Sequence, residues 1–227
     1  MVCVHTSNKA SLNKLRTAMY NFDEKNTRNA LSYLFTPDAI VHMPWPFGDM
    51  RGPDQLYNNC FAPLAKSIPD LERRDWIVVG GLTDIGDEWV GCGGHYTGTF
   101  LAPWLDIPPT GHIVHMRFHE FYKFKEGKVI EVQAIWDIPE VMMQGDCWPM
   151  APSLGREYHI PGPATLDGIV TGHWDEQKSN KSCSHIVEML EYMKLHPSTG
   201  GPEVMEMERF WHPKMNWYGP AGIGTGR

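Results

Sequence analysis

The order of periodic segments along the chain predicts an α+β fold, with helices first and a long antiparallel meander after them. Leu12, Leu15, Met19 and Phe22 recur at helical spacing near the N-terminus. Further along, apolar and polar residues alternate through two segments joined by a Lys-Glu-Gly turn, which is typical of a β-hairpin.

Start and stop signals bound the predicted elements. The first helix is expected from about Ser11 to Asp23, and the second from Thr27 to Phe35, because the residue ahead of Pro37 disfavours helix. Gly52-Pro53 opens a third helix, since proline in a first turn costs no hydrogen bond. Strands are predicted at Ala39–Met43, Glu72–Val79, Glu88–Phe100, Ile113–Phe124 and Lys128–Ile138.

Composition and charge exclude several classes of partner. The 227 residues are 42% hydrophobic, which is enough for a core, and a formal charge of −7 disfavours nucleic acid and acidic membranes. No apolar run approaches the ~20 residues of a membrane span, and no secretory leader is evident. A cytoplasmic location is therefore expected. The five cysteines are scattered without a Cys-x-x-Cys pair, which predicts buried, reduced thiols.

The C-terminal part of the chain echoes the N-terminal part. Phe35-Thr36-Pro37 corresponds without gaps to Trp211-His212-Pro213, and Arg51 corresponds to Arg227. The echo is either chance similarity around glycine and proline or a partial second copy of the domain. On the second interpretation, residues 1–145 form the domain, 146–178 a connector that follows the surface, and 179–227 the partial copy. Its uncovered apolar helix faces predict a homodimer.

Three consecutive motifs carry a resemblance to a known family. They are the strand Gly94–Phe100, the loop Ile107-Pro108-Pro109-Thr110-Gly111, and the segment His119–Glu131 with its Glu-Gly turn. This order resembles the SnoaL-like polyketide cyclases, which are related in fold to nuclear transport factor 2 and ketosteroid isomerase. The resemblance implies a cone-shaped domain, with a ligand-sized hollow between a curved antiparallel sheet and the N-terminal helices.

The hairpin turn assigns the strand faces. As a three-residue loop, Lys125-Glu126-Gly127 pairs Phe124 with Lys128 and sets Glu120 opposite Val132. One face is then almost wholly apolar and lines the hollow, with Met116, Phe118, Glu120, Tyr122, Phe124, Ile130, Val132, Ala134 and Trp136. The other face is predicted to meet water or a partner, with His115, Arg117, His119, Phe121, Lys123, Val129, Glu131, Gln133, Ile135 and Asp137.

Two residues are candidate proton carriers. Glu120 is the one acid of the apolar face, so it is either paired with an arginine or backbone amide, or has a raised pKa suited to proton transfer. His42, at the end of the first short strand, is either a base facing the hollow or a core histidine bonded to backbone.

The resemblance also implies an acid that this chain lacks. SnoaL-like cyclases usually carry a His-Trp-Asp stretch after Ile-Val-Glu, and Val132 and Ala134 stand where its histidine and aspartate are expected. Asp137 is better explained as the first residue of a capping box, Asp137-Ile138-Pro139-Glu140. A one-residue bulge would instead turn Asp137 inward as an acid.

Aromatic side chains are candidate walls for a flat ligand. Trp45, Trp104 and Trp136 fit this role, and the other predicted substrate contacts are His95, Met116, Phe118 and Tyr122. Several histidines invite a metal hypothesis, but His115 and His119 lie ~13 Å apart along a strand. No metal site is predicted.

Two functions follow from these observations. The first is a cofactor-independent enzyme that cyclises, isomerises or hydrolyses a small apolar carbonyl compound, with Glu120, His42 and Asp137 as candidate catalytic residues. The second is a non-catalytic module for ligand binding or dimerisation in which the cyclase acid is lost. Ala134 favours the second, and an acid in an apolar setting favours the first.

Overall fold

The computed structural model describes residues 3–151, 159, 161–169 and 175–215. The chain divides into two compact units, within Met1–Thr171 and within Gly172–Tyr218. The first unit holds the sheet and the site described below, and the described part of the second unit is helical.

The two N-terminal helices are α1 (Val4–Tyr20) and α2 (Glu24–Leu34). Helix α1 begins earlier than predicted because buried His5 and Asn8 extend its inward side beyond the leucines. Asp23 caps α2 by accepting a hydrogen bond from the Asn26 amide at 2.7 Å. A second helical stretch consists of α3 (Gly52–Leu56), a π-helical turn (Tyr57–Phe61) and α4 (Ala62–Ser67).

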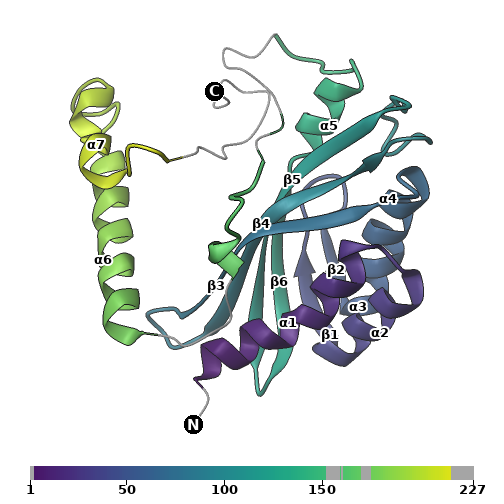
Figure 1. The fold of residues 1–227 in the computed structure, drawn as a ribbon, viewed down its shortest axis with the longest axis horizontal. Coiled ribbons are helices and arrows are strands. Elements are labelled where there is room, and N and C mark those ends of the chain that lie inside the picture. The colour runs from purple at the N-terminus through teal and green to yellow at the C-terminus, as the bar shows by residue number, and fades with distance from the viewer. Residues whose placement is uncertain (1–2, 152–158, 160, 170–174, 216–227) are drawn as a thin grey trace. The chain divides into compact units, whose positions relative to one another are not determined.

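The sheet has six strands in the order β2-β1-β6-β5-β4-β3, as Figure 1 shows. Strand β1 pairs with β6 in parallel, and the other neighbours are antiparallel. The predicted α+β fold, with N-terminal helices and a curved, unclosed sheet, is therefore confirmed. The strands are β1 (Phe35–His42), β2 (Asp49–Arg51), β3 (Glu72–Leu82), β4 (Glu88–Thr99), β5 (Ile113–Lys125) and β6 (Lys128–Trp136).

The turn between β5 and β6 differs from its prediction. Lys125 pairs directly with Lys128, so the loop has two residues, Glu126 and Gly127, with φ of 51° and 75°. Such a two-residue turn with positive φ matches the twist of the flanking strands.

A bulge on β6 then changes which residues face inward. Phe124 pairs with Val129 and Lys123 with Glu131, so Ile130 is the extra residue. Val129 is consequently fully buried in the core, and its predicted place on the outer face is wrong.

The corrected register gives Glu120 a different partner. Glu120 lies opposite Ala134, not opposite Val132 as predicted. Its predicted face is correct, because Glu120, Phe118 and Tyr122 are all buried on the inner side of the sheet.

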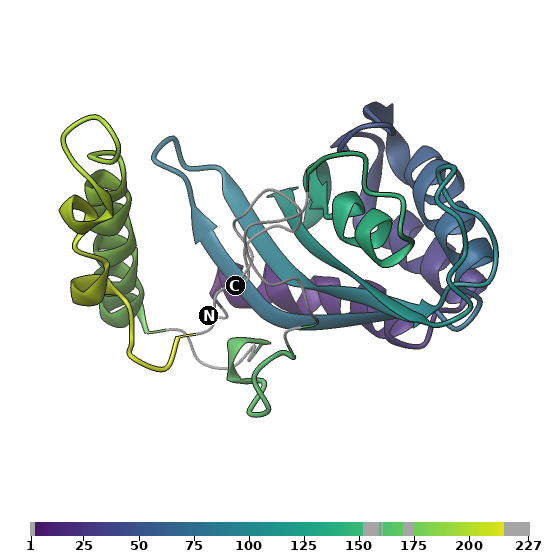
Figure 2. The same ribbon diagram turned by 90° about the horizontal axis from the view of Figure 1, so that it is seen from above.

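Helices α1 to α4 and the inner face of the sheet enclose the apolar core. The outer face carries α5 (Ile138–Gln144), which contacts β5. It also carries a segment that we call the strap, His159 with residues 161–169, whose turn at Asp167–Ile169 packs on β3 (Figure 2). Gly162 and Gly168 lie directly against Trp76 of β3, where a Cβ atom would come within 2.5 Å of it.

The second unit contains α6 (Glu176–Met193), a 3-10 turn (Pro202–Met205) and α7 (Met207–Phe210). Phe210 packs on His185 and Tyr192 of α6, with ring centroids 5.3 and 5.2 Å apart. That this unit is a partial second copy stays a prediction, and the echoed Arg227 lies outside the described residues. Among the described helices, none combines the length and apolarity that crossing a membrane requires.

Candidate functional site

Glu120 is held inside the core by four donors. Its Oε1 accepts from Tyr96 Oη at 2.8 Å and Trp136 Nε1 at 2.9 Å, and its Oε2 accepts from Arg73 Nη1 and Tyr122 Oη, both at 2.6 Å. The residue is 2% exposed. Each carboxylate oxygen thus accepts two hydrogen bonds, which fills its lone-pair positions. Glu120 is therefore paired, which is the first of the two environments predicted for it.

Arg73 continues this network toward the surface. Its guanidinium also bonds Asp75, which in turn accepts from Arg16 Nε of α1 at 3.0 Å. Burial acts to raise the pKa of Asp75, but Arg73 and Arg16 outweigh it and hold that pKa below its usual range. Burial acts to lower the pKa of Arg73, but Asp75 and Glu120 keep it well above its ordinary value. We call Glu120, Arg73, Asp75, Tyr96 and Tyr122 the carboxylate cluster.

Aromatic side chains pack the space beside the carboxylate cluster. Trp136 lies 5.2 Å from Tyr96, 5.6 Å from Phe61 and 5.7 Å from Phe47, measured between ring centroids. Phe47 also contacts Trp104 at 6.2 Å. The residues predicted to line a hollow are therefore in contact with core side chains, and this holds for Trp104, Met116, Phe118, Tyr122 and Trp136.

The other candidate proton carriers lie elsewhere. His42 is half-exposed, and its Nδ1 is 2.7 Å from Asp49 Oδ1. It follows the buried Val41 on a regularly paired strand, so it points to the sheet face opposite Glu120. Trp45 is 88% exposed, and its predicted role as a wall for a flat ligand stays a prediction.

Asp137 caps α5, as the capping-box interpretation predicted. Its Oδ1 accepts from the Glu140 amide at 3.2 Å, and its Oδ2 lies 3.4 Å from Arg117 Nη2. The bulge in β6 comes earlier, at Ile130, and does not turn Asp137 into the core. The structure thus does not bring Glu120, His42 and Asp137 together.

Three histidines meet on the outer face. His95 of β4, His115 of β5 and His159 of the strap have ring centroids 4.7 to 5.7 Å apart. Trp76 lies 4.3 Å from the His95 ring. We call these three histidines the imidazole cluster.

His95 is the buried member of the imidazole cluster. It is 1% exposed, and neither ring nitrogen has a hydrogen-bond partner among the residues that the structure describes. Burial, followed by the neighbouring His159 and His115, lowers the pKa of His95 to about 2. The ring is therefore neutral at physiological pH, with one nitrogen able to donate and the other able to accept.

Helix α5 holds His115 in place by bonding to β5 beyond the end of β6. The Gln144 side chain accepts from the His115 amide at 3.0 Å and donates to its carbonyl at 2.7 Å. Glu140 Oε1 lies 3.3 Å from His115 Nε2 and forms an ion pair with Arg117 Nε at 3.2 Å, and Glu140 Oε2 accepts from the Arg117 amide at 2.7 Å.

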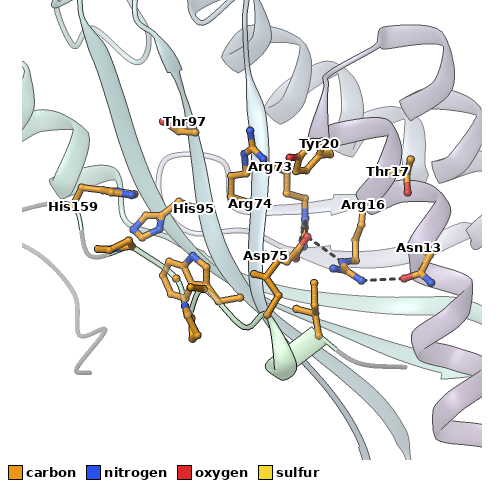
Figure 3. Close-up of a pocket in the computed structure, with 17 residues that line it drawn as sticks. Asn13, Arg16, Thr17, Tyr20, Arg73, Arg74, Asp75, His95, Thr97 and His159 are labelled. Carbon is orange, nitrogen blue, oxygen red and sulfur yellow. Dashed lines mark hydrogen bonds and ion pairs between the residues drawn. The ribbon is translucent and has the colours of Figure 1, made fainter. Parts of the chain in front are cut away.

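A cavity of about 700 Å³ lies beside the imidazole cluster, between α1, strands β3 and β4, and the strap. Figure 3 shows His159 and His95 side by side at one end and Arg16, bonded to Asp75 and Asn13, at the other. Its lining is Asn13, Arg16, Thr17, Tyr20, Arg73, Arg74, Asp75, Trp76, His95, Thr97, His159, Pro161, Gly162, Pro163, Ala164, Leu166 and Ile169. Of the residues predicted to contact a ligand, His95 is the one that lines it.

The lining residues of α1 were missed by the sequence analysis. Asn13, Arg16, Thr17 and Tyr20 recur at helical spacing beside the apolar stripe. A solvated helix face shows the same spacing, so this signal does not distinguish a cavity wall from a wet surface. Within the described part of the chain, no group of three or more potential ligand side chains is arranged to hold a metal ion.

Comparison with known proteins identifies the family. A SnoaL-like polyketide cyclase profile matches residues 13–145. A putative SnoaL-like polyketide cyclase from Jannaschia sp. CCS1 is 22% identical, with a TM-score of 0.54 over 66% of this chain and 98% of that one. AclR, a putative hydroxylase from Streptomyces galilaeus, is 18% identical, with a TM-score of 0.53 over 65% and 90% of the two chains.

These two structures, at such low identity, show the fold alone. A search of curated proteins gives no match. The family profile covers more than half of the chain and spans the C-terminal half of α1, helices α2 to α4, the sheet and α5. The chain belongs to the SnoaL-like polyketide cyclase family.

Proposed function

We propose that this SnoaL-like protein binds a flat, carbonyl-bearing organic molecule in the cavity beneath the strap, without performing the acid–base step of a cyclase. The observation that carries the proposal is His95, a neutral buried ring with two unpartnered nitrogens, in the wall of a ligand-sized cavity. A ligand carbonyl or hydroxyl would satisfy one of those nitrogens.

The chemistry of the lining supports this class of ligand. Trp76, Tyr20 and the strap prolines offer flat apolar contacts, while Asn13 and Arg16 place polar groups at the far end. A planar ring system with polar substituents at both ends fits this distribution. Membership of the SnoaL-like polyketide cyclase family supports the same choice.

The state of Glu120 argues against acid–base chemistry at the family's usual place. A general base needs a free lone pair within reach of the substrate proton, and Glu120 already accepts four hydrogen bonds in the core.

Binding is tested with emodin, a flat hydroxylated anthraquinone, by isothermal titration calorimetry. Ala164 of the strap lines the cavity, so Ala164→Trp should fill it and weaken binding at least about tenfold, or ~1.4 kcal/mol. The neighbouring exposed Thr165 is not among the lining residues, so Thr165→Trp is the matched control. Equal affinities for the two variants, or no saturable binding by the parent protein, would contradict the proposal.

A second candidate, cofactor-independent proton transfer on a small carbonyl compound, rests on the register of β5 and β6. Ala134 stands where the family's acid is expected, and Glu120 lies directly opposite it on the neighbouring strand. A carboxylate is therefore still present beside that position. His42 and Asp137 would be further proton carriers. The test is deuterium exchange next to the carbonyl of α-tetralone, measured by NMR. An enzyme would accelerate it, and Glu120→Gln would remove ~100-fold or more; a parent protein without acceleration would exclude this candidate.

We further propose that the protein is a cytoplasmic homodimer. The support is the apolar surface of α6, where Ile186, Val187 and Leu190 are all about half-exposed. Light scattering at micromolar concentration is the test, and a monomer would refute the proposal.

A further inference from the structure

We propose that the strap is a pH-dependent latch, closed over the cavity at neutral pH and opened on acidification because the closed strap buries the imidazole cluster among other cationic groups and so disfavours its protonation. A biological role for this latch rests on the proposed ligand site, but opening of the strap can be measured without any ligand. The strap and the imidazole cluster both lie within the first unit of the chain.

Three of the contacts between the described strap and the sheet involve Gly162, Gly168 and His159. Gly162 lies on the Trp76 ring, and Gly168 lies on the Trp76 carbonyl. His159 packs its ring 4.7 Å from both His95 and His115. The third contact is the one that can acquire charge between about pH 5 and 8.

Positive groups dominate the surroundings of that contact. The neighbours of His95 on β5 are His115, Arg117 and His119, and each acts against its protonation. On β3, Arg74 lies opposite His95 in register, although it is paired with Glu72. Protonating the cluster would therefore add charge where cations are already concentrated.

The nearby acids are already engaged. Glu140 of α5 reaches His115 at 3.3 Å, but it also bonds Arg117 through its guanidinium and its amide. Asp137 faces Arg117 as well, at 3.4 Å. Within the described part of the chain, His95 itself has no acceptor for either ring nitrogen, so a proton placed there would lack a carboxylate partner.

The direction of the pH effect follows from these contacts. In the closed form, the pKa of His95 is lowered to about 2, and burial is the largest cause. Burial also lowers the pKa of His159. When the strap is open, His95 regains contact with water and a pKa near ~6.5. The closed form is therefore fully favoured above about pH 6.5 and loses stability as the pH falls below it.

The expected size of the pH effect on strap opening follows from the titration of a single histidine. Between about pH 7.5 and about pH 5, a ring that binds its proton in the open form alone shifts the open-to-closed ratio about 30-fold toward open. Titration of His159 would add to this shift.

Hydrogen–deuterium exchange with mass spectrometry on the full chain tests the latch. Peptides covering residues 161–169 and β3 should lose about 30-fold in protection over that pH range, after correction for the pH dependence of chemical exchange. Peptides from the core of β5 should not. Unchanged strap protection would overturn the proposal, whether or not the cavity binds emodin.

Two variants separate the latch from general acid sensitivity. His95→Phe keeps an aromatic ring where no hydrogen bond is lost, and it should abolish most of the pH response. His159→Phe, on the exposed strap, serves the same purpose if the buried variant folds poorly. His112→Phe, at another exposed histidine, is the control and should respond like the parent. If His95→Phe and His159→Phe both retain the full response, the imidazole cluster is not the latch.

Discussion

His95 and Tyr96 are consecutive residues of β4, yet they enter two buried polar clusters on opposite faces of the sheet. Tyr96 joins the carboxylate cluster, where Glu120 and Arg73 find all their partners. His95 joins the imidazole cluster, where both of its nitrogens are unpartnered. Burial alone therefore does not identify a functional group. A saturated cluster stabilises the fold, whereas an unsaturated one has hydrogen bonds to offer a ligand.

The largest effect should come from breaking the saturated cluster. Arg73→Met leaves Glu120 and Asp75 in the core without their shared cation. We expect a loss of ~3–5 kcal/mol in the free energy of unfolding, because Glu120 becomes an uncompensated buried charge and Asp75 keeps only its pair with Arg16. Urea denaturation measures it. Arg74→Met, at a half-exposed ion pair with Glu72, is the control, with a loss below ~1 kcal/mol. Equal losses would mean that the carboxylate cluster does not stabilise the fold.

A smaller effect is expected when the consecutive residues His95 and Tyr96 are each replaced by phenylalanine. Tyr96→Phe removes the hydrogen bond to the buried Glu120 carboxylate and the one that Tyr96 accepts from Arg73, and should cost ~1.5–3 kcal/mol at neutral pH. His95→Phe removes no hydrogen bond and should cost less than ~1 kcal/mol. Both are measured by urea denaturation at about pH 7.5. A larger loss for His95→Phe would show that its ring is structurally bonded and would remove the contrast between the clusters.

The smallest effect should be found at a polar pair outside both clusters. His42 and Asp49 contact each other near the solvent, so Asp49→Asn should change stability by less than ~1 kcal/mol. It should also leave emodin binding unchanged, since neither residue lines the cavity beneath the strap. Weakened binding would indicate that the ligand contacts the β1–β2 end of the sheet instead.

The strands and their faces were largely predictable from the sequence because β-strand alternation is a strong local signal. Phe118, Glu120 and Tyr122 lie inward as predicted. The register was not predictable, because Glu126 adopts a left-handed conformation that composition does not indicate for a glutamate. One residue fewer in the turn and one bulge in β6 moved the partner of Glu120 from Val132 to Ala134.

The site was less predictable than the fold. The apolar face of the sheet indicated the core, but strand periodicity does not distinguish a hollow from a packed interior. The cavity depends on long-range contacts, such as Gly162 and Gly168 with Trp76. The Gly- and Pro-rich composition of the connector did favour a segment that follows the surface, but nothing in it specified β3 as the surface.

The Gln144 amide occupies the place that a neighbouring strand would take along the N-terminal part of β5. Beyond the end of β6, those backbone groups would otherwise be exposed in a row, the kind of template on which a foreign chain can assemble into an intermolecular sheet. The Gln144 side-chain amide has the same donor and acceptor as a peptide group, so this one residue satisfies the backbone groups of His115. Helix α5 thus provides local protection against aggregation as well as a cover for the outer face.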